Sequence, residues 1–283
     1  MKQIQSIEKV RDEVQQLRAR GKTIAFVPTM GAFHEGHLSL IRLAKKHADE
    51  VVVSIYVNPA QFGPNEDFNN YPRQVEKDVE ACEKEGVAIV FTPDNEIMYG
   101  SEEKTFTIKI EKLNVHMDGG SRPGFFEGIA LVVNKLFNII DPDVAVFGQK
   151  DIQQFLILSR MVKEFNHKVD LILAPIERAN DGLALSSRNV YLNEEERKAA
   201  PGLYRSLQYV EKQVLNGVNE PALLLKHQQG ELEAKGFKND YFNVFSFDEI
   251  APAEKLESGK KYILAGAVYL GKTRLIDNLI LEL

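Results

Sequence analysis

The sequence contains a single cysteine, Cys82, which excludes an internal disulfide and any cysteine-rich zinc site. It also lacks the run of about 18 apolar residues that a membrane-spanning helix needs, and no segment resembles the apolar part of a secretory signal. From these absences we expect a soluble, cytosolic protein that is not attached to a membrane.

Positively charged side chains are fewer than negatively charged ones. Lys and Arg together number 35 against 41 for Asp and Glu, which gives a formal net charge of −6. We therefore expect no nucleic acid as a partner, and an anionic substrate would have to be met by a local cluster of hydrogen-bond donors. With 283 residues, 44% of them hydrophobic, the chain can bury the core of one or two domains.

Two familiar nucleotide-binding patterns do not apply. The Gly-x-Gly-x-x-Gly dinucleotide fingerprint is missing, which argues against a nicotinamide or flavin enzyme. Residues 266–273 match the phosphate-loop pattern letter for letter, but their interior is Ala-Val-Tyr-Leu and both flanks resemble strands. We predict a hairpin turn at Gly271 instead.

The order of segments predicts a doubly wound α/β fold with a parallel, Rossmann-like sheet. Short β-branched runs at 23–27, 51–57, 87–91, 143–147 and 169–174 alternate with amphipathic stretches at 37–46, 74–85, 124–139 and 151–165. After residue 176, charged helical stretches at 193–215 and 220–235 precede three strand-like runs at 241–247, 261–270 and 273–283. We expect one domain over 1–176 and a smaller α+β domain over 177–283, with a hinge at 175–181.

The segment Pro-Thr-Met-Gly-Ala-Phe-His-Glu-Gly-His, residues 28–37, is the most informative part of the chain. It follows the first predicted strand and places His34 and His37 where a helix begins, so that imidazoles and backbone N–H groups can face a phosphate. Zinc binding is a weaker alternative, because the helical His-Glu-x-x-His pattern and a third ligand are missing. A surface turn with two incidental histidines is the other alternative.

Two further loops follow predicted strands and carry polar side chains that suit a small ligand. Residues 56–73 form a long loop rich in proline and asparagine, in which Gln61 is the residue to test; an ordinary surface loop is the alternative. Asp78 lies one turn into the next helix, where a carboxylate near a triphosphate could bind Mg²⁺, although a solvated charge is the commoner role. Lys150 and Gln154 follow the fourth strand and suit a phosphate and a substrate hydroxyl or carboxylate, respectively.

A fourth loop follows the last strand of the large domain. Its Leu-Ser-Ser-Arg segment combines the hydroxyls of Ser186 and Ser187 with the guanidinium of Arg188, although such a segment can also be a plain helix cap. Because the carboxyl ends of parallel strands share one edge of a sheet, we expect the four loops to surround one bound triphosphate.

Taken together, residues 28–37, 56–73, 147–154 and 181–189 resemble the pantothenate synthetase family, the ATP-dependent pantoate–β-alanine ligases. The His-Glu-Gly-His segment is similar to the His-x-Gly-His motif of the nucleotidylyltransferase superfamily, which alone indicates only nucleotide transfer. The Tyr-Val-Asn-Pro-Ala-Gln-Phe and Leu-Ser-Ser-Arg segments are more specific to the ligases.

The resemblance implies ATP as substrate, Mg²⁺ beside Asp78, and His37 as proton donor, with His34, Lys150, Ser187 and Arg188 also in the catalytic set. It implies that Gln61 contacts pantoate and β-alanine and that Gln154 contacts pantoate. The residues it implies for ATP are Met30, Gly31, Ala32, Phe33, His34, Glu35, Gly36, His37, Gly148, Gln149, Lys150, Asp151, Glu177, Leu185, Ser186, Ser187 and Arg188. Gln149 and Leu185 depart from the glutamate and methionine that are usual there, and the family is typically homodimeric.

The expected reaction is condensation of (R)-pantoate with β-alanine through pantoyl adenylate, releasing AMP and pyrophosphate. The small domain, or alternatively the Gln61–Tyr71 loop, would close over the active site to exclude water. Two alternatives remain open from the residues. One is a nucleotidylyltransferase that stops at a nucleotidyl product, and the other is a nucleotide-binding module without catalytic activity.

Overall fold

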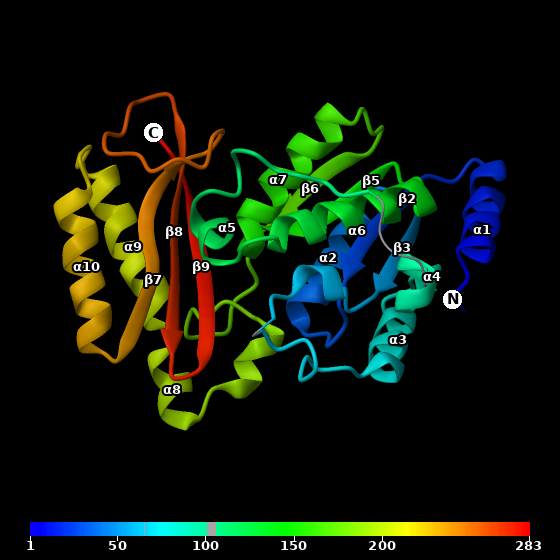
Figure 1. Ribbon diagram of the computed structural model, residues 1–283, viewed down its shortest axis with the longest axis horizontal. Coiled ribbons are helices and arrows are strands. Elements are labelled where there is room, and N and C mark those ends of the chain that lie inside the picture. The colour runs from blue at the N-terminus through cyan, green and yellow to red at the C-terminus, as the bar shows by residue number, and fades with distance from the viewer. Residues whose placement is uncertain (65, 101–105) are drawn as a thin grey trace. The chain divides into compact units, whose positions relative to one another are not determined.

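The computed structural model describes residues 1–64, 66–100 and 106–283, which form two compact units (Figure 1). The first unit consists of Met1–Ile110, Arg122–Gly148 and Gln154–Pro175. The second consists of Glu111–Ser121, Gln149–Gln153 and Ile176–Leu283. Two short segments that precede residue 176 in the chain therefore belong with the second unit, whereas the predicted domains divide at 176–177.

A six-stranded parallel sheet forms the centre of the first unit, in the order β1-β4-β3-β2-β5-β6. Its strands are β1 (Lys2–Ile4), β2 (Ile24–Thr29), β3 (Glu50–Ile55), β4 (Ile89–Phe91), β5 (Val144–Gly148) and β6 (Asp170–Ala174). This confirms the predicted doubly wound α/β fold, including all five predicted strands. The edge strand β1 was not among them, since three residues are too few for an alternating pattern to be visible.

Helices cover both faces of this sheet. They are α1 (Ile7–Ala19), α2 (Glu35–Ala44), α3 (Val75–Lys84), α4 (Asn95–Tyr99), α6 (Phe125–Ile140) and α7 (Ile152–Glu164), with a 3₁₀ turn, η1 (Pro59–Gln61). Ile41 of α2 and Cys82 of α3 pack in one core cluster with Val27. Phe26 points to the opposite face, because strand residues alternate, and meets Phe137 of α6 edge-on at 6.4 Å between ring centroids.

The order in which the chain adds parallel strands to the sheet reverses at β2. From β2 the chain proceeds to β3 on one side, and it later returns to β5 on the other side of β2. Such a reversal leaves a crevice at the carboxyl ends of the strands, where doubly wound proteins bind their ligands. Three of the polar segments predicted from the sequence, 28–37, 56–73 and 147–154, lie at the carboxyl ends of β2, β3 and β5, three neighbouring strands. The fourth, 181–189, comes after β6 in the chain and belongs to the second unit.

The second unit contains a three-stranded antiparallel sheet, β7 (Phe237–Ser246), β8 (Lys261–Leu270) and β9 (Thr273–Glu282). These long strands run beside helices α9 (Gly202–Leu215) and α10 (Ala222–Ala234), as Figure 1 shows, with Leu207 and Val268 in the shared core. The unit also contains α5 (Met117–Ser121), α8 (Glu194–Ala199) and two 3₁₀ turns, η2 (Gln149–Asp151) and η3 (Ser187–Tyr191). This confirms the smaller α+β fold.

Two local predictions in this unit can be compared with the structure. Leu270 of β8 pairs with Thr273 of β9 across a tight turn, and Gly271 in that turn has a φ of 57°. The prediction of a hairpin in place of a phosphate loop is confirmed. The helical stretch predicted at 193–215 is divided into α8 and α9, because Pro201 between them has no backbone N–H to continue the helical ladder.

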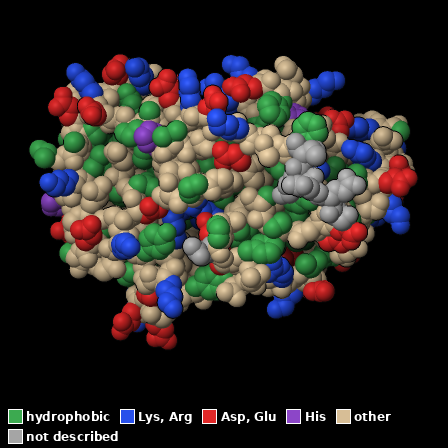
Figure 2. All heavy atoms as spheres, in the orientation of Figure 1, with side chains coloured by type: hydrophobic (Ala, Val, Ile, Leu, Met, Phe, Trp, Pro, Cys, Tyr) green, Lys and Arg blue, Asp and Glu red, His purple; other side chains and the backbone are tan. Residues whose placement is uncertain are grey.

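The surface drawn in Figure 2 carries acidic and basic side chains interspersed with one another. Within the described ranges, no helix combines the length and the apolar character that crossing a membrane requires.

Candidate active site

The loop between β2 and α2 is held by a buried carboxylate. Asp78, on α3, is only 1% exposed, and its two oxygens accept the backbone N–H groups of Ala32 and Phe33, each at 2.8 Å. The loop needs this support because Gly31 and Ala32 both have positive φ angles, 80° and 54°. The carboxylate thus fixes the backbone directly before the two histidines.

The histidines form the start of helix α2. Nδ1 of His34 accepts the backbone N–H of Gly36 at 3.1 Å, and Nδ1 of His37 accepts the backbone N–H of His34 at 3.4 Å. The rings lie 4.2 Å apart, and Phe33 stacks on His37 at 5.2 Å. A nitrogen that accepts a hydrogen bond carries no proton, so in each neutral ring the proton resides on Nε2. Both imidazoles are therefore oriented as Nε2–H donors at a helix N-terminus.

Gln61 lies against the same loop. It is 9% exposed, and its Nε2 donates to Sδ of Met30 at 2.9 Å while its Oε1 accepts from Nδ2 of Asn58 at 3.1 Å. Asn58 also donates to the carbonyl of Gly128 on α6, which fixes the segment after β3 to the sheet-covering helix. Residue 65 of the predicted 56–73 loop lies outside the described residues.

Two predicted residues flank the turn after β5 within the first unit. Gly148 ends the strand, and a Cβ built there would lie 3.9 Å from Cδ2 of Leu40 on α2, so the two segments are close. Gln154 lies half-buried in the first turn of α7. The first unit therefore links Met30, the 31–37 loop, Gln61 and Asp78 by direct contacts, and places Gly148 beside α2.

Lys150 belongs to the second unit, in the turn η2. Its Nζ lies 3.6 Å from the carboxylate of Asp151, and its side chain is 23% exposed. The turn is attached to strand β9 through Asn278, whose Nδ2 donates to the carbonyls of Gln149 and Lys150 at 2.9 and 3.1 Å. Gln149 returns a hydrogen bond from Nε2 to Oδ1 of Asn278.

The segment carrying the predicted serines is a short hairpin followed by η3. The backbone N–H of Leu185 donates to the carbonyl of Glu177 at 2.9 Å, and a bridge pairs Arg178 with Ala184. Ser186 then caps η3 by accepting the N–H of Arg188 on its Oγ at 3.3 Å, and Ser187 and Arg188 form the first turn. The helix-cap alternative is thus confirmed for Ser186.

Magnesium does not fit the predicted position. Both oxygens of Asp78 are engaged by backbone N–H groups, and the side chain is buried, whereas Mg²⁺ usually keeps several waters. Among residues 1–64, 66–100 and 106–283, no three His, Cys, Asp or Glu side chains gather in a way that could hold a metal ion. Asp78 is better described as a support of the histidine loop.

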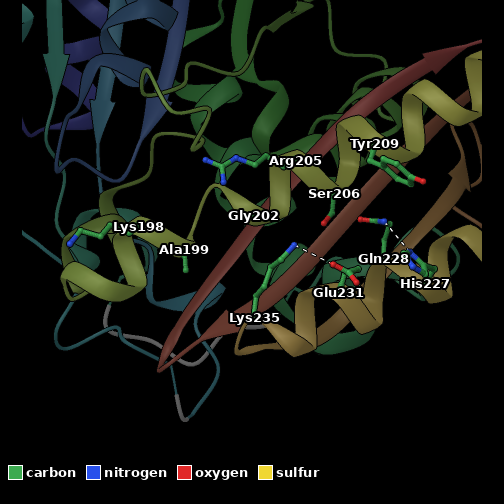
Figure 3. Close-up of a pocket in the computed structure, with 10 residues that line it drawn as sticks. All are labelled: Lys198, Ala199, Gly202, Arg205, Ser206, Tyr209, His227, Gln228, Glu231 and Lys235. Atoms are coloured by element: carbon green, nitrogen blue, oxygen red, sulfur yellow. Dashed lines mark hydrogen bonds and ion pairs between the residues drawn. The ribbon is translucent and has the colours of Figure 1, made fainter.

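A groove of about 540 Å³ lies on the second unit beside α8, α9 and α10 (Figure 3). Ser206, Gln228 and Glu231 line it, and Lys235 is paired with Glu231 at 3.5 Å. None of the residues predicted for the active site lines this groove.

Several supporting residues were not identified from the sequence. The role of Asn58 could have been predicted, because an asparagine directly before a proline is a typical N-cap of a short helical turn. Asp277 and Asn278 are consecutive polar residues, 4% and 2% exposed, in the middle of the otherwise apolar stretch Leu275–Leu281. Buried polar residues require partners, and that requirement could have pointed to them.

Comparison with known proteins agrees with the fold and the motifs. The family model described as pantoate-beta-alanine ligase matches residues 2–280. The pantothenate synthetase of Thermoanaerobacter pseudethanolicus is 49% identical over 275 residues, 97% of this chain and 96% of the relative. That of Thermotoga petrophila is 48% identical over 282 residues, 99% of this chain and all of the relative.

Solved structures agree as well. The pantothenate synthetase of Thermus thermophilus superposes with a TM-score of 0.90 at 38% identity, covering 99% of both chains. The pantoate-beta-alanine ligase of Francisella tularensis, complexed with Beta-gamma ATP and beta-alanine, superposes with a TM-score of 0.82 at 33% identity, covering 99% of this chain and 97% of that one. With a family match over nearly its whole length and relatives at this level of identity, the chain belongs to the pantoate–β-alanine ligase family.

Proposed function

We propose that the protein joins (R)-pantoate to β-alanine at the expense of ATP, through a pantoyl adenylate that is formed and consumed in the same active site. The ligation itself follows from family membership across the whole chain. ATP as the third substrate is supported by the complex of the Francisella tularensis relative. The observation that carries the adenylation step is the pair of imidazoles, both oriented as Nε2–H donors at the start of α2.

In the first step, a pantoate carboxylate oxygen attacks the α-phosphorus of ATP, and the bond to the bridging oxygen of pyrophosphate breaks. Such transfers gain mainly from alignment and from donors aimed at the developing charge, so no protein nucleophile is required. We assign this work to Nε2 of His34 and His37, with His37 as the proton donor to the phosphate oxygens. Phe33 stacks on the ring of His37, and the carboxylate of Asp78 holds the backbone directly before the two histidines.

Residues of the second unit complete the proposed ATP contacts. Lys150 supplies a compact positive charge, Ser186 and Ser187 supply hydroxyls, and Arg188 supplies a planar guanidinium suited to a phosphate. The remaining proposed contacts are Gln149, Asp151, Glu177 and Leu185.

In the second step, the neutral amine of β-alanine attacks the acyl carbon of the adenylate, and the bond between that carbon and the phosphate oxygen breaks. The amide forms as the nitrogen releases one proton to solvent, and AMP leaves with the oxygen. Gln61 is proposed to contact both acids and Gln154 to contact pantoate, since primary amides can donate to carboxylates and accept from hydroxyls and amines. Closure of the second unit to exclude water from the adenylate remains part of the proposal.

Pyrophosphate release tests this assignment. The purified protein should release pyrophosphate only when ATP and pantoate are both present, and should release AMP and form an amide only when β-alanine is added. Release of pyrophosphate without any β-alanine-dependent amide would identify a nucleotidylyltransferase instead. Binding of ATP with no pyrophosphate under any combination of substrates would overturn catalysis altogether.

Three further features stay predictions. Mg²⁺ is expected to accompany the ATP phosphates, without a protein ligand assigned among the described residues. A homodimer and a cytosolic location are expected from the resemblance and the composition. Light scattering on the purified protein tests the dimer.

A further inference from the structure

Strand β9 of the second unit contains two consecutive polar residues that reach two different segments. Asp277 accepts a bidentate ion pair from Arg178, with Nη1–Oδ2 at 2.5 Å and Nη2–Oδ1 at 2.8 Å. Asn278 donates to the carbonyls of Gln149 and Lys150. All of these residues belong to the same compact unit.

The ion pair holds the 177–185 hairpin. The side chains of Arg178 and Asp277 are 16% and 4% exposed, and the guanidinium lies 3.6 Å from the ring centre of Tyr204. Arg178 also donates to the carbonyl of Gly182 at 3.1 Å, across the hairpin to which it belongs. A buried bidentate pair with a stacked guanidinium is directional, so it fixes the position of the hairpin as well as its attachment.

The asparagine holds the turn after β5 in the same manner. Its two donor hydrogens are used on carbonyls of consecutive residues, and its oxygen accepts from Nε2 of Gln149 at 3.3 Å. An amide that is 2% exposed and satisfied on both sides leaves the turn little freedom. The backbone N–H of Asn278 donates to Oδ1 of Asp277 at 2.8 Å, which couples the two anchors to each other.

We propose that Asp277 and Asn278 are positioning residues for ATP, fixing the segment that carries Lys150 relative to the segment that carries Ser186, Ser187 and Arg188. The inference rests on the proposed function, because it takes those four residues as ATP contacts. Asp277 and Asn278 do not touch the substrate in this scheme. They set the spacing of the groups that do, and misplacement by about 1 Å can cost a factor of about 100 in rate.

The test compares steady-state kinetics of Asn278→Ala with the wild type. We expect kcat/KM for ATP to fall by about 10- to 100-fold while KM for pantoate stays within about twofold, because Gln61 and Gln154 belong to the other unit. Asn278→Asp keeps the shape but directs a carboxylate at two carbonyl oxygens. Its deficit should shrink as the pH falls, since a protonated carboxyl can again donate.

The ion pair is tested by a double-mutant cycle. Asp277→Asn and Arg178→Gln should each lower kcat/KM for ATP, and the double variant should lose no more than the worse single variant, because the two groups act together. Glu282→Gln is the matched control. Glu282 lies on the same strand as Asp277 and Asn278, and the substitution breaks its exposed pair with Lys261 of β8, so it should leave the kinetics unchanged.

The outcomes separate the two proposals. If the wild type releases no pyrophosphate from ATP and pantoate, the proposed function fails. If the wild type is active and the Asn278 variants fold, as judged by near-UV circular dichroism, but keep wild-type kcat/KM for ATP, the positioning role is overturned. Equal increases of KM for ATP and for pantoate would overturn it as well. Should Asn278→Ala fail to fold, Asn278→Asp and the Arg178→Gln cycle decide by the same criteria.

Discussion

An oxygen of Asp78 occupies the space that a side chain at position 31 would need: a Cβ built on Gly31 would lie 2.8 Å from Oδ2 of Asp78. The φ of Gly31, 80°, is also one that other residues rarely adopt. Position 31 therefore requires glycine for two reasons: its backbone has a positive φ, and a side chain there would collide with the Asp78 carboxylate that holds the loop.

Asp78→Ala should destabilise the protein and disturb the histidines together. It leaves the N–H groups of Ala32 and Phe33 without their acceptors, at roughly 1 to 3 kcal/mol each, so we expect the free energy of unfolding to fall by about 2 to 6 kcal/mol. Urea unfolding measures this loss. We expect kcat to fall as well, and Asp78→Asn, which keeps one acceptor oxygen, to be intermediate in both respects.

The matched control is Glu80→Gln on the exposed side of α3, where Glu80 pairs with Lys84. It should change neither stability nor kcat by much, because exposed pairs contribute little. An Asp78→Asn variant of unchanged stability that needs a much higher Mg²⁺ concentration would instead support the metal role that the sequence suggested.

Substitutions of His37 should separate its capping role from its chemistry. In His37→Asn, Oδ1 can still accept the N–H of His34, but the Nε2–H donor is lost. We expect kcat to fall by about 100-fold or more with a folded protein, measured by pyrophosphate release. His37→Gln can place an amide N–H near the former Nε2 and should recover part of the loss. His47→Asn, at an exposed histidine near the end of α2, is the control.

Gln61 offers a test of substrate selectivity. Gln61→Glu keeps the acceptor for Asn58 but replaces the Nε2 donor with a negatively charged oxygen, which repels a carboxylate substrate. KM for pantoate should therefore rise more in Gln61→Glu than in Gln61→Ala, whereas KM for ATP should change little in either. Equal KM values for pantoate in the two variants and the wild type would remove Gln61 from pantoate binding.

Much of the fold was predictable because its signals are local. The runs at 23–27 and 51–57 are apolar and β-branched, and buried parallel strands require that composition. The division of 193–215 at Pro201 was not predicted, although the missing N–H of proline is a local signal that could have been used. The affiliation of 111–121 and 149–153 with the second unit depends on long-range packing that no local pattern records.

The site was predictable to a different degree. The histidine segment stands out because a strand, a glycine turn and a helix start follow one another directly. The sequence suggests Asp78 as a metal ligand but gives no indication that its oxygens accept the N–H groups of Ala32 and Phe33, because these lie 46 and 45 residues away in the chain. Asp277 and Asn278 were missed for the same reason, since their partners are about 100 and 130 residues distant.

The single cysteine is buried in the core of the first unit. Cys82 is 0% exposed, and burial, with a smaller contribution from the charge of Asp78, raises the pKa of its thiol from 9.0 to about 12. The folded protein should therefore resist thiol reagents at pH 8 and react only after unfolding. The folded thiol holds its proton more tightly than the unfolded one. The contribution of the protonated Cys82 to the free energy of unfolding is therefore complete below pH 9 and declines as the pH rises toward 12.

This decline is measurable as a difference between two proteins. Between pH 7 and pH 10, the free energy of unfolding of the wild type should fall by about 1.4 kcal/mol more than that of Cys82→Ala, since one pKa unit corresponds to about 1.4 kcal/mol. Tyr99, whose pKa burial raises to about 12, lowers stability at high pH in both proteins and cancels in the comparison. Parallel pH profiles for the two proteins, or rapid labelling of native Cys82 at pH 8, would contradict the buried, protonated thiol.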